Sequence, residues 1–431
     1  MTFPLHCQTA MASSRRVAGR DKTMKILFFT ENSYCGGLDS FLVTLADHWP
    51  SAGDELVLLC NRNHPGLEVI RRRVRRPLKI VGHDLPMAAA WLERLRRLPG
   101  GRWLAKAASP ALRYLVFLLQ VRRVGALLRA VDPGRLMIGN GGYPAGDSCR
   151  AAAIAWDRLR GDRPKAVHNV HNLAYPPRRW DALPEGLIDR RVGKASLAFV
   201  AVSRACAASL PANRPDAAGQ APVIHVYNGI AEPPPVAASG WLRAELGVAA
   251  GTPLALMLGT YEPRKGHAFL IAAWRRVYAA LPGAQLVICG HGTPAERAHV
   301  ADLVKRAGLA GCVHLFGFRD DVAGLLAETD VLVVAAQAFE SFGLTLVEAM
   351  AQRVPVVATA VGGIPEVVGD DEAGFVVAPD DEAGYADRVA ALLADPALRR
   401  RIGERGFARY HRLFTACRMA EEYARLIRQT A

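Results

Sequence analysis

The chain has 431 residues, which is more than one hydrophobic core usually supports, so two domains of about 200 residues are expected. Hydrophobic residues make up 51% and charged residues 22%, a composition typical of a globular enzyme that excludes a low-complexity chain. The net charge of +14 is uneven: residues 24–230 hold 30 Lys and Arg against 16 Asp and Glu, whereas residues 231–431 hold 20 against 23. This distribution argues against a nucleic-acid surface on the second half.

Residues 1–23 form a leader without the apolar centre of a signal peptide. Met24 directly precedes a strand-like run, so we expect the leader to be disordered or a misassigned start. The best apolar run, Tyr114 to Val121, has about eight residues, whereas a membrane span needs about 20. Eight cysteines without a CxxC pair predict neither a zinc site nor a disulfide framework, and they favour the reducing cytoplasm.

Residues 24–230 alternate between short apolar runs and helical patterns, which predicts a Rossmann-like domain. The expected strands lie at residues 25–30, 56–59, 136–138, 166–168, 197–202 and 223–226. The expected helices cover residues 38–49 and much of 87–130.

The basic charge of this half is densest between Arg71 and Lys79, in the run RRRVRRPLK, and it continues through Arg94 to Lys106. Trp91, Trp103 and several leucines lie among these basic residues. The mixture is typical of an amphipathic helix on an anionic membrane surface. A solvated, arginine-rich outer face is an equal alternative, and a peripheral position on the inner face of the membrane therefore stays open beside a cytoplasmic one.

Consecutive prolines at residues 233–235 mark a linker, because they cannot continue a helix or a central strand. Residues 231–410 then predict a second Rossmann-like domain, and residues 411–431 a final helix that packs back on the first domain. The expected strands lie at residues 254–258, 286–289, 313–315, 331–334 and 354–359; the expected helices lie at 268–280, 294–307, 322–328, around Glu348, 396–410 and 416–427. The predicted α/β architecture is two Rossmann-like domains that face each other across a cleft.

Glu340 and Glu348 flank Ser-Phe-Gly, which can form a tight turn, and a helix-forming run. A turn that opens a helix presents unpaired backbone N–H groups and a partial positive charge, which favours a phosphate. Eight helical residues advance about 12 Å, so one carboxylate could reach a sugar and the other a ribose. The segment predicts a holder for a nucleotide-sugar.

Four glycine-bearing loops follow strands in the second half. They begin at Gly259, Gly290, Gly317 and Gly362. The first loop ends in Arg264-Lys265-Gly266, where a lysine beside a glycine is a natural partner for a diphosphate. Each loop alone is weak evidence, but all four occur in order around Glu340 and Glu348.

These residues closely resemble the retaining glycosyltransferases of family 4, also called glycosyl transferases group 1, which have the GT-B fold. The matching pieces of residues 254–381 are GTYEPRKGH, VICGHG, VHLFGFRDDV, AFESFGLTLVEAMAQRVPVVATAVGGIPEVV and GFVVAPDDE. The first half matches more loosely, at residues 32–37, His171-Asn172, Ser203 and residues 227–230.

The resemblance implies three catalytic residues. Glu340 would face the transferred sugar, and Lys265 would neutralise the leaving diphosphate. His171 would contact the donor sugar near its anomeric carbon, whereas His168, three residues before it, is expected to pack or to lie behind the site.

The resemblance also implies residues that bind the donor. Glu348 would accept hydrogen bonds from the ribose hydroxyls, and the glycines would let the backbone approach the donor. The donor-binding set is Gly36, Gly37, Arg264, Gly290, Phe342, Gly343, Leu344 and Glu348. The family often has arginine where this chain has Thr260, so Arg264 is a candidate to compensate for the missing cation.

The implied activity moves a sugar, with retention of configuration, from a nucleotide-diphosphate sugar to a saccharide or lipid-linked acceptor, in the synthesis of cell-surface polysaccharide or glycolipid. No Asp-x-Asp motif lies beside a strand, so no metal and no other cofactor is expected. An anionic membrane surface is a further expected partner, and nucleic acid is not. The alternatives are a GT-B relative such as a sugar-nucleotide epimerase, and a non-catalytic nucleotide-binding protein.

Overall fold

The computed structural model describes residues 23–32, 36–98, 100–234, 236–369 and 371–429. The predictions for residues 1–22 and for motif residues 33–35 lie outside this part of the chain. The chain divides into two compact units. Unit 1 holds residues up to Val202, Cys206–Val226 and the residues from Ala416 onward; unit 2 holds Ser203–Ala205 and Tyr227–Thr415.

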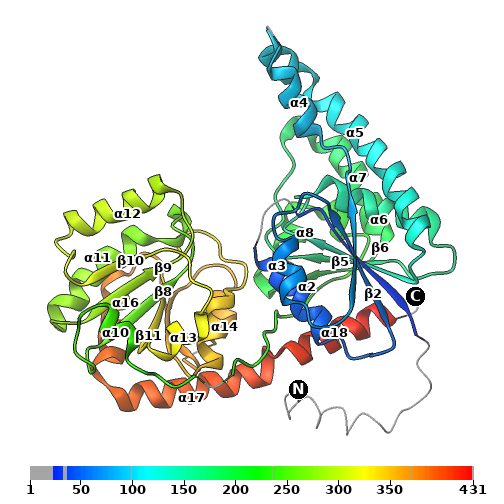
Figure 1. Ribbon diagram of the computed structural model, residues 1–431. Helices are drawn as coiled ribbons and strands as arrows, with labels where there is room; N and C mark the ends of the chain where they lie inside the picture. The colour runs from blue at the N-terminus through cyan, green and yellow to red at the C-terminus, as the bar shows by residue number, and fades with distance from the viewer. Residues whose placement is uncertain (1–22, 33–35, 99, 235, 370, 430–431) are drawn as a thin grey trace. The chain divides into compact units, whose positions relative to one another are not determined.

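Unit 1 is built on a seven-stranded parallel sheet with the strand order β3-β2-β1-β4-β5-β6-β7 (Figure 1). Its strands are β1 Lys25–Thr30, β2 Glu55–Asn61, β3 Leu78–His83, β4 Arg135–Asn140, β5 Ala166–Val170, β6 Ser196–Ala201 and β7 Val223–His225. Strand β1 lies between β2 and β4, so the order reverses there. Such a reversal opens a crevice at the carboxyl ends of the strands, where ligands of open α/β sheets bind.

Helices cover both faces of this sheet. They are α2 Gly37–Asp47, α3 Leu67–Arg73, α4 Ala88–Arg96, α5 Gly101–Val131, α6 Asp147–Leu159, α7 Ala182–Ala195, α8 Arg204–Asn213, α9 Pro215–Ala218 and α18 Ala416–Arg428, with a 3-10 turn at Arg179–Asp181. Helices α5, α6 and α7 share one core with the sheet, and α2, α3 and α18 share the other. Strand β1 explains this arrangement, because Leu27 and Phe29 enter the first core while Ile26 and Phe28 enter the second.

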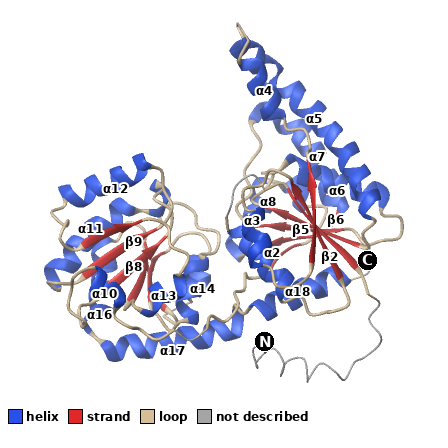
Figure 2. Cartoon of the chain, in the orientation of Figure 1, coloured by secondary structure: helices blue, strands red, loops and turns tan. Residues whose placement is uncertain are grey.

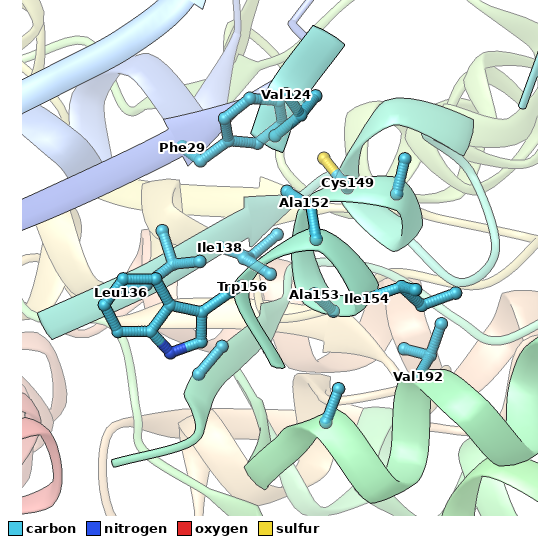
Figure 3. Packing of buried hydrophobic residues seen from close by; sticks show 14 of the residues in the cluster. Phe29, Val124, Leu136, Ile138, Cys149, Ala152, Ala153, Ile154, Trp156 and Val192 are labelled. Carbon is cyan, nitrogen blue, oxygen red and sulfur yellow. The ribbon is translucent and has the colours of Figure 1, made fainter. Parts of the chain in front are cut away.

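Figure 3 shows the first of these cores, where residues of helix α6 pack against strand residues. The indole of Trp156 lies beside Leu136 of β4 and donates a hydrogen bond to the carbonyl oxygen of Pro164 at 2.9 Å. A buried indole N–H needs such a partner. Helix α6 was not predicted from the sequence, because its apolar positions are mostly small alanines.

The last helix of the chain, α18, belongs to unit 1. Its apolar side packs on the sheet, and the ring of Tyr423 meets Phe41 of α2 edge-on at 5.3 Å. The Tyr423 hydroxyl accepts a hydrogen bond from Asn169 Nδ2 of β5 at 2.5 Å, and Arg428 pairs with buried Asp54 at 2.6 Å. The preceding helix runs to Leu413, three residues past the expected end of the second domain.

Residues 71–79, the densest basic run, are separate from the helices that carry Trp91 and Trp103. Arg71, Arg72 and Arg73 end the short helix α3, and Leu78 begins β3, the strand at the edge of the sheet. Pro77 between them cannot continue a helix. The strand was missed because its apolar residues follow the arginine run directly.

A buried network of ion pairs joins α5, α6 and α7. Arg150 lies between Glu185 at 2.8 Å and Asp189 at 3.6 Å, and Arg214 pairs with the same two carboxylates. Burial raises the pKa of Glu185 and its arginine partners lower it, with a net decrease below the ordinary value. Arg113 of α5 completes the network by pairing with Glu185 at 3.1 Å.

Unit 2 has a six-stranded parallel sheet with the order β10-β9-β8-β11-β12-β13 (Figure 2). Its strands are β8 Leu254–Leu258, β9 Gln285–Cys289, β10 Val313–Phe316, β11 Val331–Val334, β12 Val356–Thr359 and β13 Gly374–Val377. Its helices are α10 Trp241–Glu245, α11 His267–Ala280, α12 Pro294–Arg306, α13 Val322–Ala327, α14 Leu344–Ala351, α15 Ile364–Val368, α16 Glu382–Ala394 and α17 Pro396–Leu413, with a 3-10 turn at Pro263–Lys265. The predicted alternation of strands and helices is therefore present, and β13, α15 and α16 are additions to it.

Among the described residues, no helix is both long and apolar enough to cross a membrane. Five described cysteines carry free thiols: Cys60, Cys149, Cys206, Cys289 and Cys312. Cys417 is disulfide-bonded, which departs from the expectation of cysteines without disulfides.

We predict that Arg150→Met lowers the free energy of unfolding by about 3–5 kcal/mol, because it leaves Glu185 and Asp189 buried with fewer compensating charges. Urea titration followed by circular dichroism measures the loss. Arg306→Met is the matched control, since Arg306 pairs with Asp302 on an exposed helix surface, and it should cost less than about 1 kcal/mol. Equal losses in both variants would contradict the role given to the network.

Candidate functional site

The order of the strands in unit 2 places its crevice between β8 and β11. Strands β9 and β10 continue the sheet on one side of β8, and β11, β12 and β13 continue it on the other. The loop after β8 carries Lys265, and the loop after β11 carries Glu340. Because all strands are parallel, both loops lie at the carboxyl edge, the usual position of ligands in such sheets.

Lys265 and Glu340 form a close, largely enclosed ion pair. The Lys265 Nζ donates a hydrogen bond to Glu340 Oε2 at 2.5 Å, and both side chains are less than a fifth exposed. Arg264 Nη1 lies 3.8 Å from the same carboxylate oxygen, and Arg264 also pairs with Glu262. The structure thus brings together three of the predicted residues, two cations and one carboxylate.

Glycines permit the tight packing of these loops. Gly266 has φ 77°, and a Cβ atom there would lie 1.8 Å from the carbonyl oxygen of Ala335, directly after β11. A Cβ atom on Gly290 would lie 1.7 Å from the carbonyl oxygen of Gly259. The loops after β8, β9 and β11 therefore approach to distances that no other residue allows.

The fourth glycine loop supports the backbone of Glu340. The Gly363 N–H donates to the carbonyl oxygen of Glu340 at 2.8 Å. A Cβ atom on Gly362, which has φ 57°, would lie 2.1 Å from the same oxygen, and one on Gly363 would lie 2.4 Å from that of Ser341. This loop fixes the position from which the Glu340 carboxylate meets Lys265.

The predicted turn and helix after Glu340 are present, but the helix does not include all eight residues from Glu340 to Glu348, as the estimated rise of about 12 Å assumed. Gly343 has φ 85° and precedes α14, which begins at Leu344. Glu348 therefore lies only four residues into the helix, a rise of about 6 Å. Glu340 lies before the helix, whereas Glu348 lies within it. Glu348 is half-buried.

Phe342 contributes to this site mainly by packing. Its side chain is buried and lies 6.0 Å from the ring of Tyr227 and 5.8 Å from that of Phe414. These ring contacts anchor the turn that precedes α14. The predicted role of the backbone amides at Phe342, Gly343 and Leu344 stays a prediction.

Thr260 and Tyr261 show what replaces the expected arginine after Gly259. The Thr260 Oγ1 is buried and has no hydrogen-bond partner in the described part of the chain. The Tyr261 hydroxyl lies 2.9 Å from the carbonyl oxygen of Ile288 and 2.8 Å from that of Phe316, and burial raises its pKa to about 12. Tyr261 thus ties the loop to two neighbouring strands, a support that the sequence analysis missed.

In unit 1, Gly36 and Gly37 lie where β1 ends and α2 begins. Both are exposed, and a Cβ atom on Gly36 would meet nothing within 4 Å. Asp39 accepts hydrogen bonds from the Gly36 N–H at 3.0 Å and from Asn32 Nδ2 at 2.6 Å. His64 Nε2 lies 2.8 Å from the same buried carboxylate.

Asp39 and His64 were not predicted as site residues. A signal existed in the sequence, because an aspartate three residues after a helix-opening glycine can bond back to that glycine's N–H. The contribution of His64, from the loop after β2, could not be foreseen from a single chain.

His171 follows β5 and lies beside α2. Its N–H donates to the carbonyl oxygen of Asn140 at 2.9 Å, and its ring meets Phe41 edge-on at 4.4 Å. The Nε2 atom is buried without a partner in the described part of the chain, and burial lowers the pKa to about 3. His168 is fully buried among Tyr143 and Phe199, as expected of a packed histidine, and burial lowers its pKa to about 3 as well.

A separate hollow in unit 2 is lined by Arg204, Tyr227, Glu366 and Arg409. Glu366 accepts hydrogen bonds from the backbone of Arg204 at 2.8 Å and from the Tyr227 hydroxyl at 3.0 Å. Arg409 donates to the carbonyl oxygen of Glu366 at 2.7 Å. These contacts explain the glutamate of the GGIPE segment as a structural residue.

The described residues include no group of three or more His, Cys, Asp or Glu side chains placed to hold a metal ion. The absence of a metal requirement stays a prediction.

We predict that Gly266→Ala destabilises unit 2 by at least about 2 kcal/mol more than Gly308→Ala. Both glycines have left-handed backbone, with φ 77° and 72°, so both variants carry similar strain of about 1 kcal/mol. Only at Gly266 would the new methyl group meet a backbone oxygen, since a Cβ on Gly308 meets nothing. Urea unfolding of the two variants measures the difference, and equal midpoints would contradict it.

We predict that the free energy of unfolding falls as the pH drops from about 6.5 to about 5. The folded pKa values of His168 and His171 lie near 3, whereas the unfolded chain takes up protons near 6.5, so the unfolded state gains up to about 1.4 kcal/mol per pH unit for each histidine. His168→Leu should reduce this slope, measured by urea titration at several pH values. His299→Gln, at an exposed position, should leave the slope unchanged; the same slope in both variants would contradict the assignment.

Comparison with known proteins adds to this geometry. Residues 242–409 match the family described as Glycosyl transferases group 1. The chain is similar to an N-acetyl-alpha-D-glucosaminyl L-malate synthase of Bacillus anthracis, with 31% identity over 42% of this chain and 47% of that protein. It is also similar to an alpha-maltose-1-phosphate synthase of Mycolicibacterium smegmatis, with 31% identity over 62% of this chain and 73% of that protein.

The chain spans about half the length of the first two curated relatives it matches, 47% and 52%. Solved structures match almost throughout. A glycosyltransferase of Rickettsia africae has a TM-score of 0.73 at 16% identity, with 94% of this chain and 98% of that one covered. Anabaena HepE in complex with UDP has a TM-score of 0.72 at 20% identity, with 93% and 99% covered.

Both units have the parallel α/β sheets of the GT-B fold, and the solved neighbours share it. With 31% identity along nearly three quarters of the Mycolicibacterium protein and a family match across the unit that holds Lys265 and Glu340, the chain belongs to the glycosyl transferases group 1 family.

Proposed function

We propose that this protein is a retaining glycosyltransferase that moves a sugar from a nucleotide-diphosphate sugar to a saccharide or lipid-linked saccharide. The observation that carries the proposal is the enclosed pair of Lys265 and Glu340 at the crevice of unit 2, beside the turn that opens α14. The ammonium group and the helix N-terminus suit the diphosphate of a nucleotide-sugar, and the carboxylates of Glu340 and Glu348 suit its sugar and its ribose.

Transfer of the sugar breaks the bond between the anomeric carbon and the leaving phosphate oxygen. Negative charge then grows on the diphosphate and positive charge on the anomeric carbon. Lys265 and the N–H groups at the start of α14 would stabilise the first. Glu340 would face the sugar, and before the donor binds its carboxylate holds the lysine ammonium in position.

Glu348 would accept hydrogen bonds from the ribose hydroxyls, because its carboxylate stands one turn into α14, past the N–H groups that would hold the phosphate. Gly290 would allow close approach of the donor, as its lack of a side chain already allows close approach of Gly259. Arg264, whose Nη1 lies 3.8 Å from Glu340 Oε2, would offset the arginine that Thr260 replaces. The roles of Gly36, Gly37 and His171 stay predictions.

Support for the donor comes from solved neighbours, because Anabaena HepE was crystallised with UDP and with UDP-glucose. Support for a lipid-linked or cell-surface acceptor comes from relatives described as a lipopolysaccharide core glycosyltransferase and a phosphatidyl-myo-inositol mannosyltransferase. We propose a cytoplasmic protein in the synthesis of cell-surface polysaccharide or glycolipid, with no metal cofactor.

We predict that one sugar nucleotide among UDP-, GDP- and ADP-sugars is bound and turned over by the native chain, with release of the free nucleotide. Lys265→Ala should lower the rate about 100- to 1,000-fold, because it removes a charge that stabilises the leaving diphosphate. Glu348→Ala should chiefly raise the KM for the donor, because the ribose contact is equal in the ground and transition states.

Lys305→Ala is the matched control, because Lys305 is an exposed lysine of α12 in the same unit. It should retain native turnover. Failure of the folded native chain to bind any of these donors would reject the proposal, and equal loss in Lys305→Ala and Lys265→Ala would reject the role of Lys265.

A further inference from the structure

Helices α4 and α5 form a hairpin that projects beyond the strands of unit 1 (Figures 1 and 2). No residue of α4 is buried, although Leu92 and Leu95 are half-buried. The end of α4 and the start of α5 are joined by a hydrogen bond, which the Gly101 N–H donates to the carbonyl oxygen of Leu98 at 2.8 Å. A Cβ atom on Gly101 would lie 1.8 Å from the carbonyl oxygen of Leu95.

The end of this hairpin exposes large apolar side chains. Trp103 is 78% exposed, Leu104 57%, Leu98 55% and Trp91 48%. Exposed single apolar residues are common, but two tryptophans and two leucines around one turn are not explained by a solvated face. Tryptophan is enriched where a protein meets the interface between lipid headgroups and acyl chains.

Basic side chains surround these apolar ones. Five exposed basic residues lie within the same segment: Arg94, Arg96, Arg97, Arg102 and Lys106. Glu93 is the one acidic residue of α4 and α5, and it pairs with Arg96 at 3.4 Å. The hairpin tip, meaning the four apolar and five basic residues just named, therefore offers apolar anchors inside a positive rim.

The same pattern continues along α5. Leu104, Leu115 and Leu118 fall on one face of the helix, and each is more than half exposed. Arg122 follows on that face and is exposed as well. On the opposite face, Arg113 turns inward to Glu185 in the buried ion network, so the exposed apolar stripe is the outer surface of a fixed helix.

We propose that the hairpin tip docks unit 1 on an anionic lipid surface, with Trp91, Trp103 and the leucines in the interface and the basic groups on lipid phosphates. Charge complementarity decides the partner. Two copies of this chain that met tip to tip would repel each other, because each tip carries five basic residues and Glu93 is the one acidic residue of α4 and α5. Nucleic acid would take the arginines but leave the apolar groups in water. Such docking is independent of the proposed transferase activity.

The test measures cosedimentation of the full chain with vesicles of phosphatidylcholine alone or with about one third phosphatidylglycerol. We expect the chain to bind the vesicles that contain phosphatidylglycerol and not those of phosphatidylcholine alone. The combined charge variant Arg96→Gln, Arg97→Gln, Arg102→Gln should partition about a hundredfold more weakly, at about fivefold for each arginine. Trp103→Ser with Leu104→Ser should weaken binding at least about tenfold, and should do so at high salt as well, where the arginines contribute less.

A matched control removes three exposed charges of unit 2 through Lys305→Gln, Arg275→Gln and Arg400→Gln, which should leave vesicle binding unchanged. Urea midpoints equal to that of the native chain show that each variant is folded. Absence of binding by the native chain, or an equal loss in the control and the charge variant, would overturn the proposal. A dimer that dissociates on Trp103→Ser without any vesicle binding would also overturn it, in favour of a second copy.

Discussion

The arrangement of unit 2 depends on steric room at four glycines. At positions 266, 290, 362 and 363 a Cβ atom would lie between 1.7 and 2.4 Å from a backbone oxygen of a neighbouring loop. Because these loops follow β8, β9, β11 and β12, they interlock the carboxyl ends of the central strands in one layer. Close approach of these loops brings Lys265 to Glu340. Close packing of this kind holds the charged groups of Lys265 and Glu340 in position before a ligand binds, which is what electrostatic preorganisation requires.

The two segments that carry Lys265 and Glu340 could be predicted from the sequence, because each is formed by residues close together in the chain. Lys265 stands directly before Gly266, and Glu340 and Glu348 are joined by a turn and a helix start that propensity alone predicts. Asp39 and His64 were missed because they lie 25 residues apart and meet only through the order of β1 and β2 in the sheet. Strand β3 was missed for another reason. It lies at the edge of the sheet, where strands carry charged residues, so its sequence pattern is like that of a solvated surface segment.

Unit 1 uses charge in two opposite ways along one helix. At its middle, Arg113 faces the buried carboxylates that hold α5 against α6 and α7. At its start, Arg102 and Lys106 face solvent around exposed tryptophan and leucine. The basic residues of this helix thus belong partly to a buried ion network and partly to an exposed tip. For this reason the net charge of residues 24–230 could not distinguish a solvated face from an interaction surface.

The position of α18 has a consequence for how the chain is made. The face of the sheet that carries Ile26 and Phe28 is covered in part by Tyr423 and Ile427 of α18. Because α18 follows the whole of unit 2 in the sequence, unit 1 cannot complete this face until unit 2 has been synthesised. Nascent unit 1 would expose that apolar face for the time needed to translate nearly 200 residues, and transiently exposed apolar surface of this kind favours aggregation.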